Sequence, residues 1–181
     1  MKKILTLILL TIGFNTAFAQ TKEAPKDNGY IVKVGDQAPD DFELQLADGK
    51  KTNLKALRGK VVVLQFTASW CGVCREEMPH LEKDVWKAYQ NKGLELIGVD
   101  RDEPLATVQK FHKDMQITYP LALDPGADIF GRFANKKSGV TRNVVIDRKG
   151  KIVYLTRLYD KQEFEQMVKT IDKLVSEKPA I

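Results

Sequence analysis

The apolar residues in the first half of this chain follow the spacing of β-strands. Every second residue over 42–46 is apolar, which predicts a half-buried strand, and Asp48-Gly49 supplies the turn of a hairpin whose return strand begins at 51–53. The stretch 61–66 is nearly all apolar, and 94–99 has the same character. Such continuous runs are typical of central strands that are covered on both faces.

Other segments carry apolar residues at the three- and four-residue steps of an amphipathic helix. One such face runs through 72–90, a second follows the helix-start signal Asp102-Glu103-Pro104, and a third follows the capping pair Asp160 and Glu163. Shorter patterns add strand candidates at 119–123, 143–146 and 152–155 and a short helix at 127–133. Strands that alternate with helices indicate an α/β fold, with helices on both faces of the sheet.

The first residues have the three-part layout of a secretory signal peptide. Lys2 and Lys3 precede an apolar run over 4–14, and Ala17-Phe18-Ala19 offers the small residues that signal peptidase reads. The alternative is an uncleaved N-terminal anchor, but the run is only about half of the ~20 residues that a bilayer span needs. The expected parts are a signal peptide over 1–19 cleaved between Ala19 and Gln20, a polar lead-in or tether over 20–33, and one domain over 34–178. The mature protein is expected in an oxidising, extracytoplasmic compartment.

Composition places the chain among ordinary soluble proteins and excludes several classes. Its 181 residues are 43% hydrophobic and 29% charged, unlike a polytopic membrane protein, a collagen-like chain or a disordered one, and their number suits a single domain. The formal net charge is +5 without any block of basic residues, so nothing indicates nucleic acid as a partner. Two cysteines are too few for a disulfide-stapled scaffold or a Cys-rich zinc module.

Those two cysteines, Cys71 and Cys74, form a C-x-x-C pair between the apolar strand and the amphipathic helix. Cys71 is expected at the helix N-terminus, where free N–H groups and the helix dipole favour a thiolate. We therefore expect Cys71 to attack a partner's disulfide as the nucleophile, and Cys74, one turn further on, to resolve the mixed disulfide. The alternatives are a structural disulfide, whose short loop adds little stability, and a zinc site with His80 and His112, which lack zinc-ligand spacing.

The segment 61–81 resembles the active-site region of the TlpA/ResA-type thiol–disulfide oxidoreductases, which are thioredoxin-like proteins related to the AhpC/TSA group. Further matches are Gly35-Asp36-Gln37-Ala38-Pro39 at the start of the domain, Pro79 in the helix after the cysteines, and 146–151 near the end of the domain. The resemblance implies a thioredoxin fold with an N-terminal β-hairpin extension and a central insertion around 103–128.

The same resemblance implies how and where the protein works. The redox centre would be the Cys71–Cys74 disulfide, with no metal and no organic cofactor. The partners would be protein thiols and disulfides of the cell envelope in the periplasm of a bacterium, with a membrane involved only through an uncleaved leader. The direction of electron flow depends on the reduction potential of the dithiol and is not readable from the residues.

Residues beside the cysteines are further candidates for the site. Glu77 stands three residues after Cys74, matches a glutamate of the ResA subgroup, and could take the proton of Cys74 as a general base. The alternative for Glu77 is a solvated surface residue. Trp70 precedes Cys71 and is expected to shield the thiol and to offer a flat contact surface to a partner. Gln65 stands where cytosolic thioredoxins carry a buried aspartate.

The chain departs from the proteins it resembles opposite the cysteines. Thioredoxin-like proteins place a cis-proline six residues before the aspartate of the I-D-x-x-G turn, and here that position, counted from Asp147, is Thr141. A non-proline cis bond costs ~2.5–4 kcal/mol, so we expect a trans peptide before Thr141 and a loop that still faces Cys71. Thr141 or Arg142 would line the substrate groove, and Arg142 would favour the thiolate. The alternative for Arg142 is an outward-facing position at the strand end.

Two other functions are alternatives to disulfide exchange. A thiol peroxidase of the AhpC/TSA type would also lack the cis-proline, but its pocket carries P-x-x-x-T/S-x-x-C. Here Leu64 and Ala68 stand seven and three residues before Cys71, so a peroxide lacks an obvious polar cradle. A non-catalytic interaction module would keep the thioredoxin fold but would not need both thiols.

Overall fold

The computed structural model describes residues 28–177, and they contain a seven-stranded mixed sheet in the order β2-β1-β5-β4-β3-β6-β7. The strands are β1 (Leu44–Leu46), β2 (Lys51–Thr52), β3 (Val61–Thr67), β4 (Leu94–Arg101), β5 (Leu121–Asp124), β6 (Arg142–Ile146) and β7 (Ile152–Arg157). The expected signal peptide, its cleavage point between Ala19 and Gln20 and most of the lead-in lie outside the described residues.

The middle of the sheet consists of β3 and its two neighbours. β3 is parallel to β4 and antiparallel to β6, and each of its residues is buried. The apolar run over 61–66 predicted such a strand, because a strand covered on both faces has no side open to water. The register aligns Gln65 with Gly98 on one side and with Asn143 on the other, which brings two polar side chains into the core.

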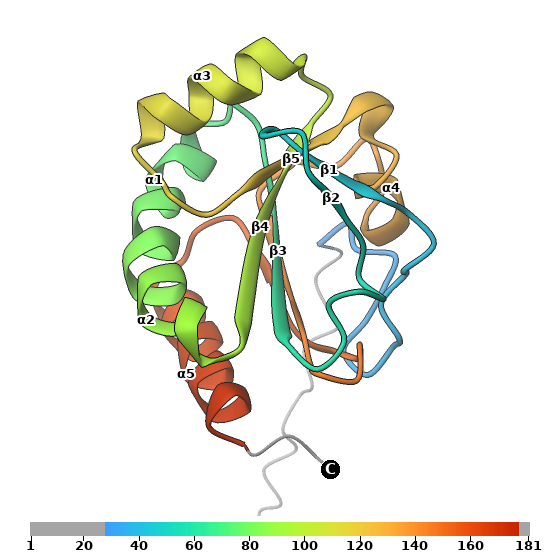
Figure 1. Cartoon of the computed structure of the whole chain (residues 1–181). Helices are drawn as coiled ribbons and strands as arrows, with labels where there is room; N and C mark the ends of the chain where they lie inside the picture. The colour runs from blue at the N-terminus through green and yellow to red at the C-terminus, as the bar shows by residue number, and fades with distance from the viewer. Residues whose placement is uncertain (1–27, 178–181) are drawn as a thin grey trace, which may run out of the picture.

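The helical segments cover both faces of the sheet (Figure 1). They are α1 (Gly72–His80), the π-helical η1 (Leu81–Trp86), α2 (Lys87–Tyr89), the 3₁₀ turn η2 (Gln90–Lys92), α3 (Leu105–Met115), the 3₁₀ turn η3 (Pro125–Ala127), α4 (Phe130–Phe133) and α5 (Lys161–Ser176). Apolar side chains of α1, η1, α3 and α5 pack on one face, and those of α4 pack on the other. Within residues 28–177 no helix has the length and apolar character that crossing a bilayer requires.

The first helical stretch is continuous but changes its winding after Pro79. The predicted apolar face over 72–90 is present, and Met78, Leu81 and Val85 are fully buried. Proline has no N–H to donate to the carbonyl one turn earlier, and its ring crowds that carbonyl. The helix accommodates this by widening into the π-helical turn that begins at Leu81.

Two additions extend the central strands. The hairpin of β1 and β2 forms at the predicted Asp48-Gly49 turn and joins the sheet through antiparallel pairing of β1 with β5. The segment after β4 supplies α3 and then β5, which pairs parallel to β4. This agrees with the expected α/β fold, its N-terminal hairpin extension and its central insertion around 103–128.

The described end of the lead-in, 28–33, is attached to the domain. Tyr30 forms an isolated β-bridge with Ala134, and its hydroxyl lies 2.7 Å from the carbonyl oxygen of Thr156 and 3.0 Å from that of Asn143. The ring of Tyr30 lies under the guanidinium of Arg142 at 4.7 Å. The segment that the sequence suggested as a tether therefore ends in a fixed contact with β6 and β7.

Candidate redox site

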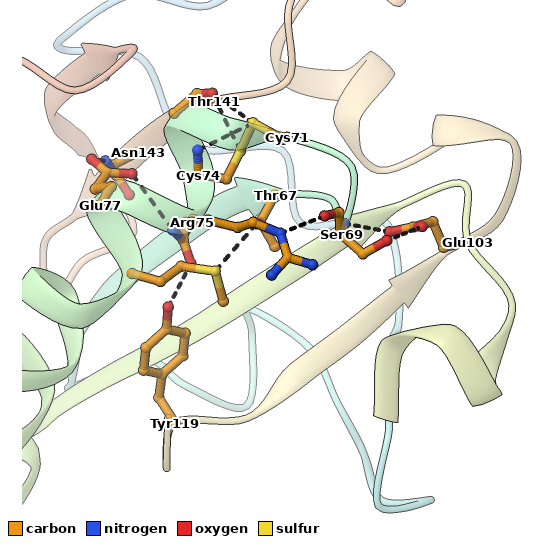
Figure 2. The surroundings of a disulfide bond; sticks show 12 residues. Thr67, Ser69, Cys71, Cys74, Arg75, Glu77, Glu103, Tyr119, Thr141 and Asn143 are labelled. Carbon is orange, nitrogen blue, oxygen red and sulfur yellow. Dashed lines mark hydrogen bonds between the residues drawn. A yellow bond between two sulfur atoms is a disulfide. The ribbon is translucent and has the colours of Figure 1, made fainter. Parts of the chain in front are cut away.

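The two cysteines form a disulfide at the N-terminus of α1 (Figure 2). Cys71 is the N-cap residue with an extended backbone, and its Sγ accepts the N–H of Cys74 at 3.2 Å. This N–H is one of those that the first turn of a helix leaves without a partner inside the helix. Cys71 is 8% exposed and Cys74 is 0% exposed. The sulfur that a partner can reach is therefore also the one that helix N–H groups stabilise as a thiolate.

Thr141 lies directly against the disulfide. Its Oγ1 is 3.1 Å from the Sγ of Cys71 and 3.2 Å from the Sγ of Cys74. A disulfide sulfur carries no hydrogen, so the hydroxyl is the donor in this state. No cis peptide occurs among residues 28–177, which confirms the trans bond predicted before Thr141. The loop before β6 thus faces the cysteines, with a hydroxyl where related proteins place a proline ring.

We expect Thr141→Val to raise the pKa of the Cys71 thiol in the reduced protein by about one to two pH units, because hydrogen bonds to a charged group contribute roughly 1.5–3 kcal/mol. The rate of Cys71 alkylation as a function of pH measures this change. Thr67→Val is the matched control, since Thr67 is also fully buried but its hydroxyl contacts the sulfur of Met78. Equal pKa values in both variants would show that the Thr141 hydroxyl does not support the thiolate.

Glu77, on α1 after the cysteines, is buried and does not lie on the surface. It is 1% exposed, its Oε1 accepts the Nδ2–H of Asn143 at 2.6 Å, and its Oε2 lies 3.5 Å from Nε2 of Gln65. The solvated alternative for Glu77 is therefore wrong. Burial raises the pKa of Glu77 to about 7, although the two amide hydrogen bonds lower it. Because residues three apart lie on one side of a helix, the side chain of Glu77 is on the same side of α1 as Cys74.

A chain of polar side chains continues from Glu77 into the core (Figure 2). The Oε1 of Gln65 accepts the hydroxyl of Tyr119 at 2.8 Å, and Nδ2 of Asn143 also donates to Oγ1 of Thr156 at 2.9 Å. Tyr119 is fully buried, and this burial raises its pKa, so the phenol stays neutral and remains a donor. The network fixes the Glu77 carboxyl group in a site from which water is largely excluded.

Arg142 does not join the cysteines, which corrects the expectation that it lines the groove with Thr141. Successive residues of a strand point to opposite faces, so Thr141 and Asn143 face α1 while Arg142 faces away from it. Its guanidinium lies over the rings of Tyr30 and Phe130, and the residue is fully buried. The outward-facing alternative is therefore wrong as well. Arg142 holds the N-terminal segment against the back of β6.

Other sequence candidates are placed as follows. Trp70 is 65% exposed beside Cys71, so its ring is available as a contact surface at the rim of the site. His80 stacks on Tyr159, and His112 contacts a backbone carbonyl through Nε2. Among residues 28–177 no three His, Cys, Asp or Glu side chains form a group that could hold a metal ion.

Sequence analysis missed the partners of Glu77. Gln65 was seen only as the replacement of a buried aspartate, Asn143 only as the start of a strand and Tyr119 only as part of a strand candidate. The available signal was polarity within apolar strands, since Gln65 and Asn143 are polar residues in segments that are otherwise buried and apolar. Together the parts form an accessible sulfur at a helix N-terminus, a second sulfur behind it, and a buried carboxyl group beside the second.

Comparison with known proteins identifies a family and relatives of this chain. The model of the AhpC/TSA family matches residues 34–155. The thiol-disulfide oxidoreductase ResA of Bacillus cereus is 30% identical over 172 residues, which cover 95% of this chain and 94% of that protein.

Two solved structures are similar to this chain in sequence and in fold. A proposed protein disulfide isomerase from Bacteroides thetaiotaomicron is 58% identical with a TM-score of 0.80, and the match covers 82% of this chain and 94% of that one. A proposed thiol:disulfide interchange protein DsbE from Chlorobium tepidum is 28% identical with a TM-score of 0.69, over 80% of this chain and 99% of that one. These likenesses confirm the expected thioredoxin-like fold.

Proposed function

The chain belongs to the AhpC/TSA family and is related within it to the ResA-type thiol–disulfide oxidoreductases, and from this premise we propose that it exchanges disulfides with protein partners through Cys71 and Cys74. One observation carries the proposal: the dithiol stands at a helix N-terminus with a buried carboxyl group whose pKa is raised to about 7 on the adjoining turn. A structural disulfide would need neither the carboxyl group nor an accessible sulfur.

In the first step, the reduced Cys71 thiolate attacks one sulfur of a partner's disulfide. A sulfur–sulfur bond forms between Cys71 and the partner, the partner's own bond breaks, and its second sulfur leaves as a thiolate. Before the attack, the N–H of Cys74 and the hydroxyl of Thr141 stabilise the charge on Cys71. The attacking role falls to Cys71 because Cys74 is completely buried.

In the second step, Cys74 resolves the mixed disulfide. Its thiol gives a proton to the Glu77 carboxylate, and the resulting thiolate attacks the Sγ of Cys71. The Cys71–Cys74 disulfide forms as the bond between Cys71 and the partner breaks, and the partner's sulfur leaves as a thiolate that takes up a proton. Two electrons have then passed from the protein to the partner. A carboxyl group with a pKa of about 7 suits this transfer, because it is ionised in part of the molecules at neutral pH and can return the proton afterwards.

The location and the partners follow from the same proposal. We place the protein in the periplasm, where the expected signal peptide over 1–19 would deliver it and where disulfide exchange is needed. Its partners are thiols and disulfides of cell-envelope proteins, and Trp70 offers them an exposed flat surface beside Cys71. The dithiol itself is the redox centre, so the reaction as proposed calls for no further cofactor.

The AhpC/TSA family also suggests a thiol peroxidase as a second candidate. The residues behind Cys71 argue against it, because Leu64 and Ala68 are fully buried apolar residues at the positions of the proline and hydroxyl of a peroxidatic pocket. The hydroxyl at the site comes instead from Thr141 across the sheet.

We therefore expect the reduced protein to reduce the disulfides of insulin readily and to react with hydrogen peroxide no faster than an ordinary low-pKa thiol. Stopped-flow measurement of the oxidation of the dithiol gives both rates on one sample. The Cys71→Ala variant controls for reactions that do not involve the site. Fast, saturable peroxide turnover together with slow insulin reduction would favour a thiol peroxidase over disulfide exchange.

A further inference from the structure

Ser69 lies in the loop that leads into Cys71, and each of its polar groups forms a hydrogen bond with a charged side chain (Figure 2). The backbone N–H of Ser69 donates to Oε2 of Glu103 and its hydroxyl donates to Oε1 of the same carboxylate, both at 2.6 Å. The carbonyl oxygen of Ser69 accepts Nε–H of Arg75 at 2.7 Å. Hydrogen bonds to charged groups are roughly twice as strong as those between neutral groups.

Glu103 belongs to the central insertion and not to the redox motif. It stands between β4 and α3, just before Pro104, the residue that caps α3. The preceding Asp102 has a left-handed backbone, and its N–H and carboxylate bond to the carbonyl oxygen of Asp124 and the N–H of Gly126. The position of Glu103 is therefore set by the insertion, which reaches across to the loop before Cys71.

Asp100 lies next to this contact and is fully buried. It pairs with Thr67 at the end of β3, and neither of its carboxyl oxygens has a hydrogen-bond donor among residues 28–177. The titratable groups that face it are Glu103 from the following loop and Asp124 from β5, both acceptors. A favourable contact with Glu103 thus requires a proton on Asp100. Burial and, after it, the charge of Glu103 raise the pKa of Asp100 to about 8.

We propose that Glu103, with the buried Asp100 beside it, is a positioning residue that fixes the loop before Cys71 through Ser69 and so sets the reactivity of the Cys71 thiolate. This inference deepens the proposed disulfide exchange and rests on it. Ser69 is held by Glu103 only two residues before Cys71. The N–H of Cys71 donates to the carbonyl oxygen of Ala68 at 3.1 Å, so the turn around Ser69 connects directly to the residue that carries the sulfur. When the hydrogen bonds between Glu103 and Ser69 break, the sulfur of Cys71 moves away from the first N–H groups of α1.

The test uses single variants, a double variant and a small disulfide. We expect Ser69→Ala and Glu103→Gln each to slow the reaction of reduced Cys71 with 5,5′-dithiobis(2-nitrobenzoate) at pH 7 by roughly tenfold, because a misplacement of about 1 Å can cost about a hundredfold. The double variant should be no slower than Glu103→Gln alone, since both changes break one contact. Asp102→Asn is the matched control, because it removes a neighbouring carboxylate charge but keeps the Oδ1 that accepts the N–H of Gly126, so the position of Glu103 is preserved.

The pH profile separates positioning from a merely structural role. Above pH 8, ionised Asp100 repels Glu103, so the rate per thiolate in the wild-type protein should fall several-fold between pH 8 and 9.5. In Asp100→Asn the side chain carries no charge at any pH, so that fall should be absent. Rates within twofold of wild type in the single variants, effects that multiply in the double variant, or an unchanged fall in Asp100→Asn would each overturn the inference.

The small disulfide also keeps the two proposals distinguishable. It reports on Cys71 whether or not a protein is the natural partner, so failure of insulin reduction by the wild-type protein would count against the proposed function alone. Melting temperatures of the oxidised variants show whether folding is intact. Ser69→Ala removes only a partly exposed hydroxyl, so it preserves the test if Glu103→Gln does not fold.

Discussion

Cys74→Ala should turn the protein into a trap that holds its partners on Cys71 as mixed disulfides, whereas Cys71→Ala should lower disulfide exchange by roughly 10³-fold or more, to the level seen without the protein. The asymmetry follows from the geometry. Cys71 is the partly exposed helix cap that accepts a helix N–H, while Cys74 is completely buried behind it. Without Cys74 the first step still proceeds, but no thiol is placed to complete the second.

The measurement is non-reducing electrophoresis after incubation with an envelope extract, followed by release of the partners with dithiothreitol. The Cys71→Ala/Cys74→Ala double variant controls for proteins that adhere without a disulfide. A matching alkylation series should show that Cys71 reacts well below pH 8 in the reduced wild-type protein while Cys74 stays inert. If Cys71→Ala trapped partners and Cys74→Ala did not, the roles of the two cysteines would be reversed.

Glu77→Gln should slow release of the mixed disulfide by about 10²-fold and leave its formation nearly unchanged, because general-base catalysis contributes roughly 10²–10⁴-fold to a proton-transfer step. The amide has the shape of the carboxyl group but cannot take the Cys74 proton. In the wild-type protein the release rate should rise between pH 6 and 8 as Glu77 ionises, and in the variant this rise should be lost. Single-turnover kinetics with a chromogenic disulfide separate the two steps.

Glu76→Gln is the matched control, since Glu76 is the neighbouring glutamate but is exposed. It should affect neither step. Equal slowing of formation and release in Glu77→Gln would mean that Glu77 serves the structure of the site and not the resolving proton transfer.

The same substitution should change how stability depends on pH. Burial raises the pKa of Glu77 from an ordinary 4.5 to about 7, so the folded protein binds this proton more tightly than the unfolded chain. Its contribution is fully present below pH 4.5 and is lost as the pH rises through 7, a difference of about 3 kcal/mol. Glu77→Gln should therefore raise the free energy of unfolding relative to wild type at pH 8 by about that amount more than at pH 4. Guanidinium unfolding of the oxidised proteins measures this, and an equal difference at both pH values would contradict the burial of an ionisable Glu77.

The strands, the helices and the redox motif could be predicted from the sequence because each depends on local periodicity. The apolar run of β3 and the helical spacing after it place Cys71 at a strand–helix junction, and a helix N-terminus activates whichever thiol caps it. The hairpin of β1 and β2 was predicted by alternation and by the Asp48-Gly49 turn. The π-helical turn after Pro79 was not predicted, because the apolar spacing continues unchanged through it.

The sequence by itself therefore determined the fold class and the dithiol, whereas only the tertiary structure decided what surrounds the dithiol. Glu77 is a surface or a buried residue depending on whether Asn143 and Gln65 meet it, and that depends on the register of β3 with β6. The same register sets the direction of Arg142. Successive side chains of a strand point to opposite faces of the sheet, and Thr141 points toward the cysteines. The contact between Ser69 and Glu103 joins segments 34 residues apart. Periodicity along a chain reports which face of an element is apolar, but not which polar groups of distant elements come to share one buried space.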